Sequence, residues 1–147
     1  MKKTYTDNSI EAQEADYLYI NTSQLPNAGK GLYTAIDIYK DEVISLFKGP
    51  ILSNRQVENR VEKNKDAYFI KMLDGSIMDS MQTHCFAKYA NDAVGYTKSV
   101  FKNNSKIVID EHGMVCIMAT KRIKTNTEIF CGYGKAYWKK HGASQEE

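Results

Sequence analysis

The fold of this chain is organised around one C-terminal stretch, Glu128-Ile129-Phe130-Cys131-Gly132-Tyr133-Gly134-Lys135-Ala136-Tyr137-Trp138. Its first four residues predict a short strand, and the residues after Gly134 predict a brief helix that carries aromatic side chains. Between them, the glycines on both sides of Tyr133 allow the backbone to bend sharply without steric cost. Such a turn can hold the phenol of Tyr133 over a cavity. A strand that ends in a turn, with Tyr133 packed as a core residue, is the alternative for this stretch taken alone.

The rest of the composition describes one globular domain. A chain of 147 residues, 42% of them hydrophobic and 26% charged, is long enough to bury a core of its own. The formal net charge of +2 is too small to indicate nucleic-acid binding by itself. No apolar run approaches the roughly 20 residues that span a bilayer, which argues against a membrane protein.

Cysteine usage and the N-terminus indicate the compartment. The three cysteines (Cys85, Cys116 and Cys131) are few, odd in number and far apart, which favours a reducing environment, and no Cys-x-x-Cys pair suggests zinc. The first residues lack the apolar segment of a signal peptide. We therefore expect an intracellular protein, cytoplasmic or nuclear, without a metal site.

Short strands and few helices make the predicted fold mainly β. Asp74-Gly75 and Glu111-His112-Gly113 each separate two strand-like segments, as in hairpins. Ser53 and Gln56 have the spacing of a capping box, which predicts a polar surface helix up to about Lys63. The other expected segments are a loosely held arm at 1–16, strands at 17–21, 32–35 and 43–48, a short helical turn at 85–93 that breaks at Asn91-Asp92, and a polar loop at 93–104.

Four blocks follow one another along the chain: Gly29-Lys30-Gly31-Leu32-Tyr33, the hairpin at 68–79, Ala87-Lys88-Tyr89-Ala90-Asn91-Asp92-Ala93 with Asn104 after it, and Glu128-Ile129-Phe130-Cys131-Gly132-Tyr133-Gly134. Together they resemble the SET domain of protein lysine methyltransferases over residues 17–138. Each block is loose alone, but four in register over a small domain are fairly specific. We therefore expect an N-terminal arm at 1–16, a SET domain at 17–141 and a C-terminal tail at 142–147.

The resemblance implies a β-clip-like fold of short curled sheets with few helices and a C-terminal pseudoknot that unites Asn91 and Tyr133. It also implies S-adenosylmethionine as the methyl donor and a protein or peptide substrate whose lysine enters a narrow channel. Histones are candidate substrates on this basis. The family has no membrane partner, a nucleic-acid partner is not expected, and the oligomeric state is not indicated.

The same resemblance assigns roles to individual residues. Tyr133 is the expected catalytic residue, because its phenol oxygen can orient the free amine of the substrate lysine and lie near the transferred methyl group. A side chain at Gly31 is expected to weaken cofactor binding more than folding. The residues expected to bind the cofactor are Gly29, Lys30, Gly31, Lys88, Tyr89, Asn91, Asp92, Tyr133 and Trp138. The residues expected to line the substrate channel are Phe47, Ile107 and Cys131.

Some of these assignments have structural alternatives. Asn91 can cap the helical turn before it, Trp138 can seal the core instead of stacking on adenine, and Lys30 can be solvated. Two positions also depart from the family pattern: Asp92 stands where His is usual, and Phe47 where many members have a channel Tyr.

These departures keep a second function open, a catalytically silent SET-like module that binds peptide or cofactor. Cys131 is smaller than the Phe or Tyr often found there, which leaves room for higher methylation states. The absence of cysteine-rich flanking segments favours a small free-standing SET protein. A third hypothesis, a nucleic-acid binder, rests on the basic run Lys121-Arg122-Ile123-Lys124, which is more typical of a solvated turn.

Overall fold

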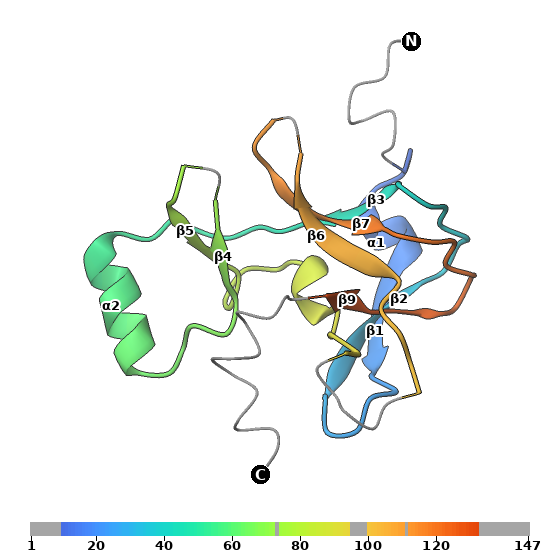
Figure 1. Ribbon diagram of the computed structural model, residues 1–147, viewed down its shortest axis with the longest axis horizontal. Helices are drawn as coiled ribbons and strands as arrows, with labels where there is room; N and C mark the ends of the chain where they lie inside the picture. The colour runs from blue at the N-terminus through green and yellow to red at the C-terminus, as the bar shows by residue number, and fades with distance from the viewer. Residues whose placement is uncertain (1–9, 73, 95–99, 111, 133–147) are drawn as a thin grey trace.

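Figure 1 shows the computed structural model, which describes residues 10–72, 74–94, 100–110 and 112–132. The fold is mainly β, as predicted, with short strands in three small sheets. Two sheets lie together on one side of the molecule, and the third sheet lies beside helix α2 on the other (Figure 1). No helix in these described ranges is long and apolar enough to cross a membrane.

The first sheet has the order β1-β2-β8, the second has the order β3-β7-β6-β9, and the third pairs β4 with β5. In chain order the elements are α1 (Glu14–Tyr17), β1 (Leu18–Thr22), β2 (Lys30–Thr34), β3 (Val43–Leu46), α2 (Asn54–Glu62), β4 (Phe69–Lys71), β5 (Ile77–Asp79), the 3₁₀ helix η2 (Ala87–Tyr89), β6 (Ser105–Ile109), β7 (Val115–Ala119), β8 (Glu128–Ile129) and β9 (Cys131–Gly132).

The segment before β1 is held more firmly than the sequence predicts. The carboxylate of Glu14 accepts hydrogen bonds from the Ser45 hydroxyl at 2.5 Å and from the Leu46 N–H at 3.1 Å. The buried hydroxyl of Tyr17 donates to the Ile44 carbonyl at 2.6 Å. Glu14, which the sequence places in the expected loose arm, is thus tied to strand β3, 31 and 32 residues further along the chain.

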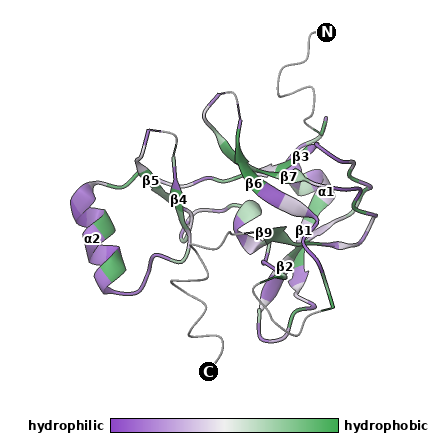
Figure 2. Ribbon diagram, viewed as in Figure 1, coloured by the Kyte–Doolittle hydropathy of each residue, from purple (hydrophilic) through white to green (hydrophobic). Residues whose placement is uncertain are grey.

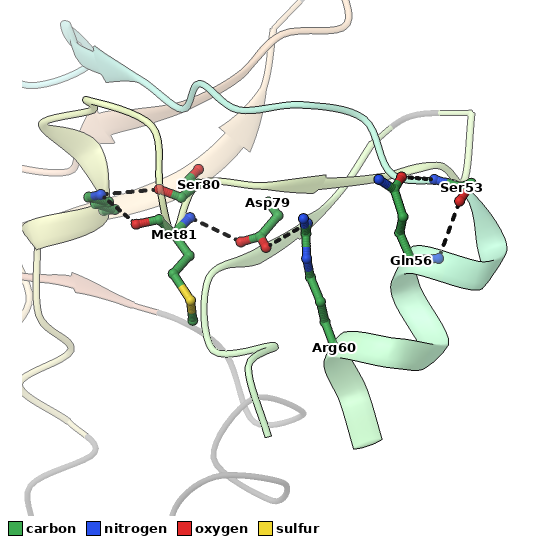
Figure 3. A network of polar contacts seen from close by, with 7 residues as sticks. Ser53, Gln56, Arg60, Asp79, Ser80 and Met81 are labelled. Carbon is green, nitrogen blue, oxygen red and sulfur yellow. Dashed lines mark hydrogen bonds and ion pairs between the residues drawn. The ribbon is translucent and has the colours of Figure 1, made fainter. Parts of the chain in front are cut away.

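Helix α2 begins as the sequence predicts. Ser53 and Gln56 form the expected capping box, and none of the helical residues is buried. Figure 2 shows the helix mostly in the hydrophilic colour, as a surface element should be. An ion pair of 3.0 Å between Arg60 of the helix and Asp79 links the helix to strand β5 (Figure 3). The Asp79 carboxylate also accepts the Met81 N–H.

Both predicted hairpins are confirmed. Strands β4 and β5 pair antiparallel on either side of the Asp74-Gly75 turn, and β6 and β7 do so around the second turn. The core lies under the two larger sheets and is built from buried aliphatic side chains such as Leu32, Ile44 and Ile117. A second, smaller apolar cluster joins Leu25, Ala93 and Phe130.

The C-terminal stretch forms two strands instead of the single one predicted for residues 128–131. Strand β8 pairs antiparallel with β2 in the first sheet, whereas β9 pairs parallel with β6 in the second. Between them the Phe130 carbonyl accepts the N–H groups of Asn104 and Ser105, at 3.0 and 3.1 Å. The chain changes hydrogen-bonding partners at Phe130, so it passes from one sheet to the other and joins them.

Candidate functional site

The crossing strand, residues 128–132, is held between two asparagines that the sequence singled out. On one side the Cys131 N–H donates to the Asn91 carbonyl at 2.8 Å, and Phe130 forms a parallel bridge with Asn91. On the other, the buried amide of Asn104 accepts the Phe130 N–H at 2.9 Å and donates to the Glu128 carbonyl at 3.0 Å. The described part of the predicted knot is therefore fastened by backbone and amide groups that are far apart in sequence.

Asn91 also reaches the predicted cofactor loop. Its side-chain amide donates to the Lys30 carbonyl at 2.9 Å, where strand β2 begins. The preceding Gly29 has φ of 72°, a left-handed conformation that suits glycine. A Cβ placed on Gly29 would meet no atom of the described residues within 4 Å, so among them the space beside this turn is open. Asn91 thus brings together the glycine turn and the crossing strand that ends at Gly132.

Gly31 faces a carboxylate at close range. A Cβ built on Gly31 would lie 2.2 Å from Oε2 of Glu128 and 3.2 Å from the Cα of Ser23. The absence of a side chain at Gly31 leaves room for the Glu128 carboxylate. This packing alone explains why glycine stands here, and no ligand is needed to explain it. Gly29, and not Gly31, is the position that borders open space.

Glu128 is completely buried, although its sequence motif assigns no individual role to its side chain. Its Oε2 accepts the Ser23 hydroxyl at 2.7 Å, and its Oε1 accepts the Gln24 N–H at 2.8 Å. The Tyr33 hydroxyl lies 3.3 Å from Oε1, although its nearer acceptor is the Thr22 carbonyl at 2.6 Å. Desolvation and then the Glu128 charge raise the pKa of Tyr33 to about 12, so this phenol keeps its donor hydrogen at neutral pH.

The sequence signal that points to Glu128 is a charged residue at the start of an otherwise apolar strand segment, followed by Ile129, Phe130 and Cys131. A carboxylate at such a position is rarely buried without partners. Its partners could not be read from the sequence, because Ser23 and Gln24 lie 105 and 104 residues away.

Asp92 has a structural role in the place where the family usually has His. Its buried carboxylate accepts the Asn103 amide at 2.8 Å and the Val94 N–H at 3.0 Å. Asn103 in turn accepts the Ala93 N–H at 2.8 Å. Asp92 and Asn103 therefore fasten the two ends of the loop that connects η2 to β6, and Asn103 is a second residue that the sequence analysis did not identify.

Lys88 does not extend into open space. Its ammonium donates to the carbonyls of Ser80, Met81 and Thr83 at 3.2, 3.0 and 3.0 Å. The ring of Tyr89 lies 5.4 Å from the same nitrogen and is partly buried against the core. The Lys88 ammonium is thus hydrogen-bonded to backbone carbonyls. These bonds explain why a lysine stands at position 88 without the predicted cofactor contact.

Replacing Lys88 with Met is expected to lower the free energy of unfolding by about 1–3 kcal/mol, because three carbonyls lose their charged donor while the chain length is kept. Urea unfolding measures the effect. Lys71→Met, at an exposed position on β4, is the matched control and should change stability by less than about 0.5 kcal/mol. A loss of cofactor affinity at unchanged stability would instead support the contact predicted from the resemblance.

The three predicted channel residues belong to one region of the core. Phe47 and Cys131 are buried in the main apolar cluster, and Ile107 packs against it while partly exposed. Burial raises the pKa of the Cys131 thiol to about 12, so it stays a neutral apolar side chain at physiological pH. The structure places these residues in or against the same apolar cluster, and their role as channel walls stays a prediction.

Two predicted residues, Tyr133 and Trp138, lie outside the described residues. Tyr133 directly follows Gly132, the last described residue of β9. Within the described ranges, no three His, Cys, Asp or Glu side chains converge to form a metal site.

Comparison with known proteins agrees with this architecture. The SET domain profile matches residues 29–134. A curated relative, Histone-lysine N-methyltransferase SETD7 of Halocynthia roretzi, is 25% identical over 125 residues, which is 82% of this chain and 32% of the relative.

Two solved structures of ctPRC2 are also similar. One is an apo form with mutations in Ezh2, with a TM-score of 0.63 and 27% identity over 84% of this chain and 16% of the other. The second is ctPRC2 in an autoinhibited conformation bound to S-adenosylmethionine, with a TM-score of 0.64 and 26% identity over 88% of this chain and 17% of the other. The chain thus spans about a third of the curated relative and about a sixth of these structures. With a family profile that covers most of its length and with the matching fold, the chain belongs to the SET-domain family of protein lysine methyltransferases.

Proposed function

We propose that this protein is an S-adenosylmethionine-dependent protein lysine N-methyltransferase. The observation that carries the proposal is the position of Asn91. Its side chain binds the Lys30 carbonyl beside the open glycine turn, and its backbone carbonyl binds Cys131, two residues before Tyr133. One residue therefore joins the expected cofactor loop to the strand that leads to the expected catalytic tyrosine.

The residue types fit the chemistry of methyl transfer. When bound, S-adenosylmethionine supplies an electrophilic methyl group on a sulfonium. The substrate lysine has a reference pKa of about 10.4 and must be neutral to attack, which an apolar channel favours by disfavouring the ammonium. Phe47, Ile107 and the protonated Cys131 provide such an apolar region. Because the reaction is an in-line displacement, positioning of the two reactants supplies much of the acceleration.

The glycine turn fits the amino-acid end of this cofactor. The open space beside Gly29 lets backbone donors approach a carboxylate closely, and the exposed Lys30 adds a positive charge nearby. Asn91 carries an acceptor oxygen on the same amide whose nitrogen is bound to Lys30, so it remains able to read a donor of the cofactor.

The silent-module alternative loses one of its two supports. Asp92 accepts hydrogen bonds from its own loop, so the replacement of the usual His has a structural explanation. Phe47 still lacks the channel hydroxyl found in many members, so the alternative rests on that position. The nucleic-acid alternative has little support, because Arg122 of the basic run is paired with Asp37 at 2.8 Å and Ile123 is buried.

Calorimetric titration is expected to show binding of S-adenosylmethionine and of its demethylated product. Incubation of the cofactor with a lysine-rich protein mixture, histones included because of the curated relative, should then give mass increases in steps of one methyl group on lysine. Cofactor binding without methylation would favour the silent module. No heat and no thermal shift at millimolar ligand would overturn the proposed function altogether.

A further inference from the structure

We propose that Glu128 is the positioning residue of the cofactor loop: its buried carboxylate holds residues 23–31 in register with the crossing strand. This inference rests on the proposed function for the meaning of the loop, but the contacts that carry it do not. Glu128 makes them with its own side chain, on the face of the strand that points away from the main core.

Side-chain alternation along the crossing strand explains why one face serves the loop. In extended backbone, successive side chains point to opposite faces. Ile129 and Cys131 are buried in the main core cluster. Phe130 packs instead with Leu25 from the loop, and Glu128 binds Ser23 and Gln24 of the same loop. The loop is therefore held by one apolar and one charged anchor from the same face.

The carboxylate orders three consecutive loop residues. Ser23 donates its hydroxyl hydrogen to Oε2 at 2.7 Å and accepts the Leu25 N–H at 3.1 Å. The Ser23 hydroxyl therefore also holds the backbone of Leu25. Gln24 donates its backbone N–H to Oε1 at 2.8 Å. The Ser23 N–H closes the loop onto the Gly29 carbonyl at 2.8 Å, immediately before Lys30. Through these hydrogen bonds, Glu128 fixes the backbone on both sides of the glycine turn.

The hydrogen bonds that Glu128 makes with Ser23 and Gln24 require a carboxylate, because both of its oxygens act as acceptors. Hydrogen bonds to an ionised acceptor are shorter and stronger than neutral ones, and both oxygens here face donors. An amide at position 128 would present one acceptor oxygen and one NH₂ group. The NH₂ group would face either the Ser23 hydroxyl, whose hydrogen would then lose its acceptor, or the Gln24 N–H, which cannot accept at all. The Glu128→Gln variant keeps the volume and removes only this match.

The first test needs no ligand. Hydrogen exchange of Glu128→Gln, followed by mass spectrometry of peptides, should show at least tenfold faster exchange in residues 23–31 than in the parent. Exchange in β6 and β7 should stay within about threefold. Unchanged exchange in the loop would overturn the proposal, and so would equal acceleration throughout the chain.

The second test separates positioning from general stability. In Glu128→Gln the dissociation constant for S-adenosylmethionine should rise about tenfold, while turnover at saturating cofactor should stay within about threefold. Ser45→Ala is the control, because it likewise disrupts a hydrogen bond between a buried serine hydroxyl and a carboxylate, but at Glu14 in α1. Its cofactor affinity should equal that of the parent. An unchanged dissociation constant in Glu128→Gln, or an equal rise in Ser45→Ala, would contradict the assigned role.

Two further variants guard against misfolding. Ser23→Ala removes one donor at the edge of the network and should show the same loop exchange to a smaller extent. Adding Ser23→Ala to Glu128→Gln removes the conflicting hydroxyl, so the double variant should recover part of the lost affinity. If the parent bound no cofactor, the proposed function would fall, whereas the exchange experiment would still decide whether Glu128 holds the loop.

Discussion

Tyr133→Phe is expected to lower methyl-transfer turnover by about 10²–10³, roughly 3–4 kcal/mol of transition-state stabilisation. The ring is retained, so packing is conserved, and the change removes a single oxygen. By the family resemblance this oxygen orients the free amine of the substrate lysine and accepts weak hydrogen bonds from the transferring methyl group. In sequence, Tyr133 directly follows Gly132, the last described residue of the strand fastened to Asn91, which supports that role.

The defect should appear in the single-turnover rate at saturating cofactor, because an interaction made chiefly in the transition state affects the chemical step and not cofactor binding. Tyr39→Phe is the matched control. Tyr39 is 54% exposed and far along the chain from the crossing strand, so the loss of its hydroxyl should leave the rate unchanged. A Tyr133→Phe variant that transfers methyl groups within a few-fold of the parent rate would show that Tyr133 is a packing residue.

Local elements could be predicted because their determinants lie within a few residues. The capping box at Ser53 and Gln56 and the Asp74-Gly75 turn act over two to four positions, and both are present as expected. The exact ends of helices and strands also depend on contacts with residues far along the chain. The first strand starts at Leu18 because Tyr17 ends a helix whose Glu14 is bound to Ser45, a contact that no local pattern reveals.

The candidate site could be predicted only as far as its family motifs reach. The motifs single out Asn91 and Asn104, and the structure shows both hydrogen-bonded to the crossing strand. Lys88 was expected at the cofactor because its motif lies there, whereas its ammonium binds three carbonyls five to eight residues earlier. A flexible side chain of that length can point to either side, and sequence does not specify which.

Glu128 and Gly31 show the same limit more sharply. Each belongs to a quoted motif, but their mutual contact joins positions 97 residues apart and depends on the pairing of β2 with β8. From sequence, Gly31 was expected to serve the cofactor. The packing of Gly31 against Glu128 predicts the opposite order of effects, so we expect a side chain there to weaken folding more than cofactor binding.

Gly31→Ala is therefore expected to lower the free energy of unfolding by about 2–3 kcal/mol. The added Cβ would lie 2.2 Å from Oε2 of Glu128, too close for any real contact. A surface side chain could swing away, but this one is fully buried and held by Ser23 and Gln24. Relief therefore requires either strain in β2 or the loss of buried charged hydrogen bonds, and each costs about 1–3 kcal/mol.

Gly29→Ala, two residues earlier, is the matched control for Gly31→Ala in urea unfolding. Its Cβ would meet no atom of the described part of the chain within 4 Å, but its φ of 72° costs a residue with a side chain about 1–2 kcal/mol. Gly31→Ala should thus be the more damaging change even though its backbone is ordinary extended strand. A double-mutant cycle with Glu128→Ala identifies the cause, because removing the carboxylate should make the Gly31→Ala change cheaper by at least about 1 kcal/mol. Additive effects, or a Gly31→Ala variant no less stable than Gly29→Ala, would mean that the space beside Gly31 is not filled by Glu128.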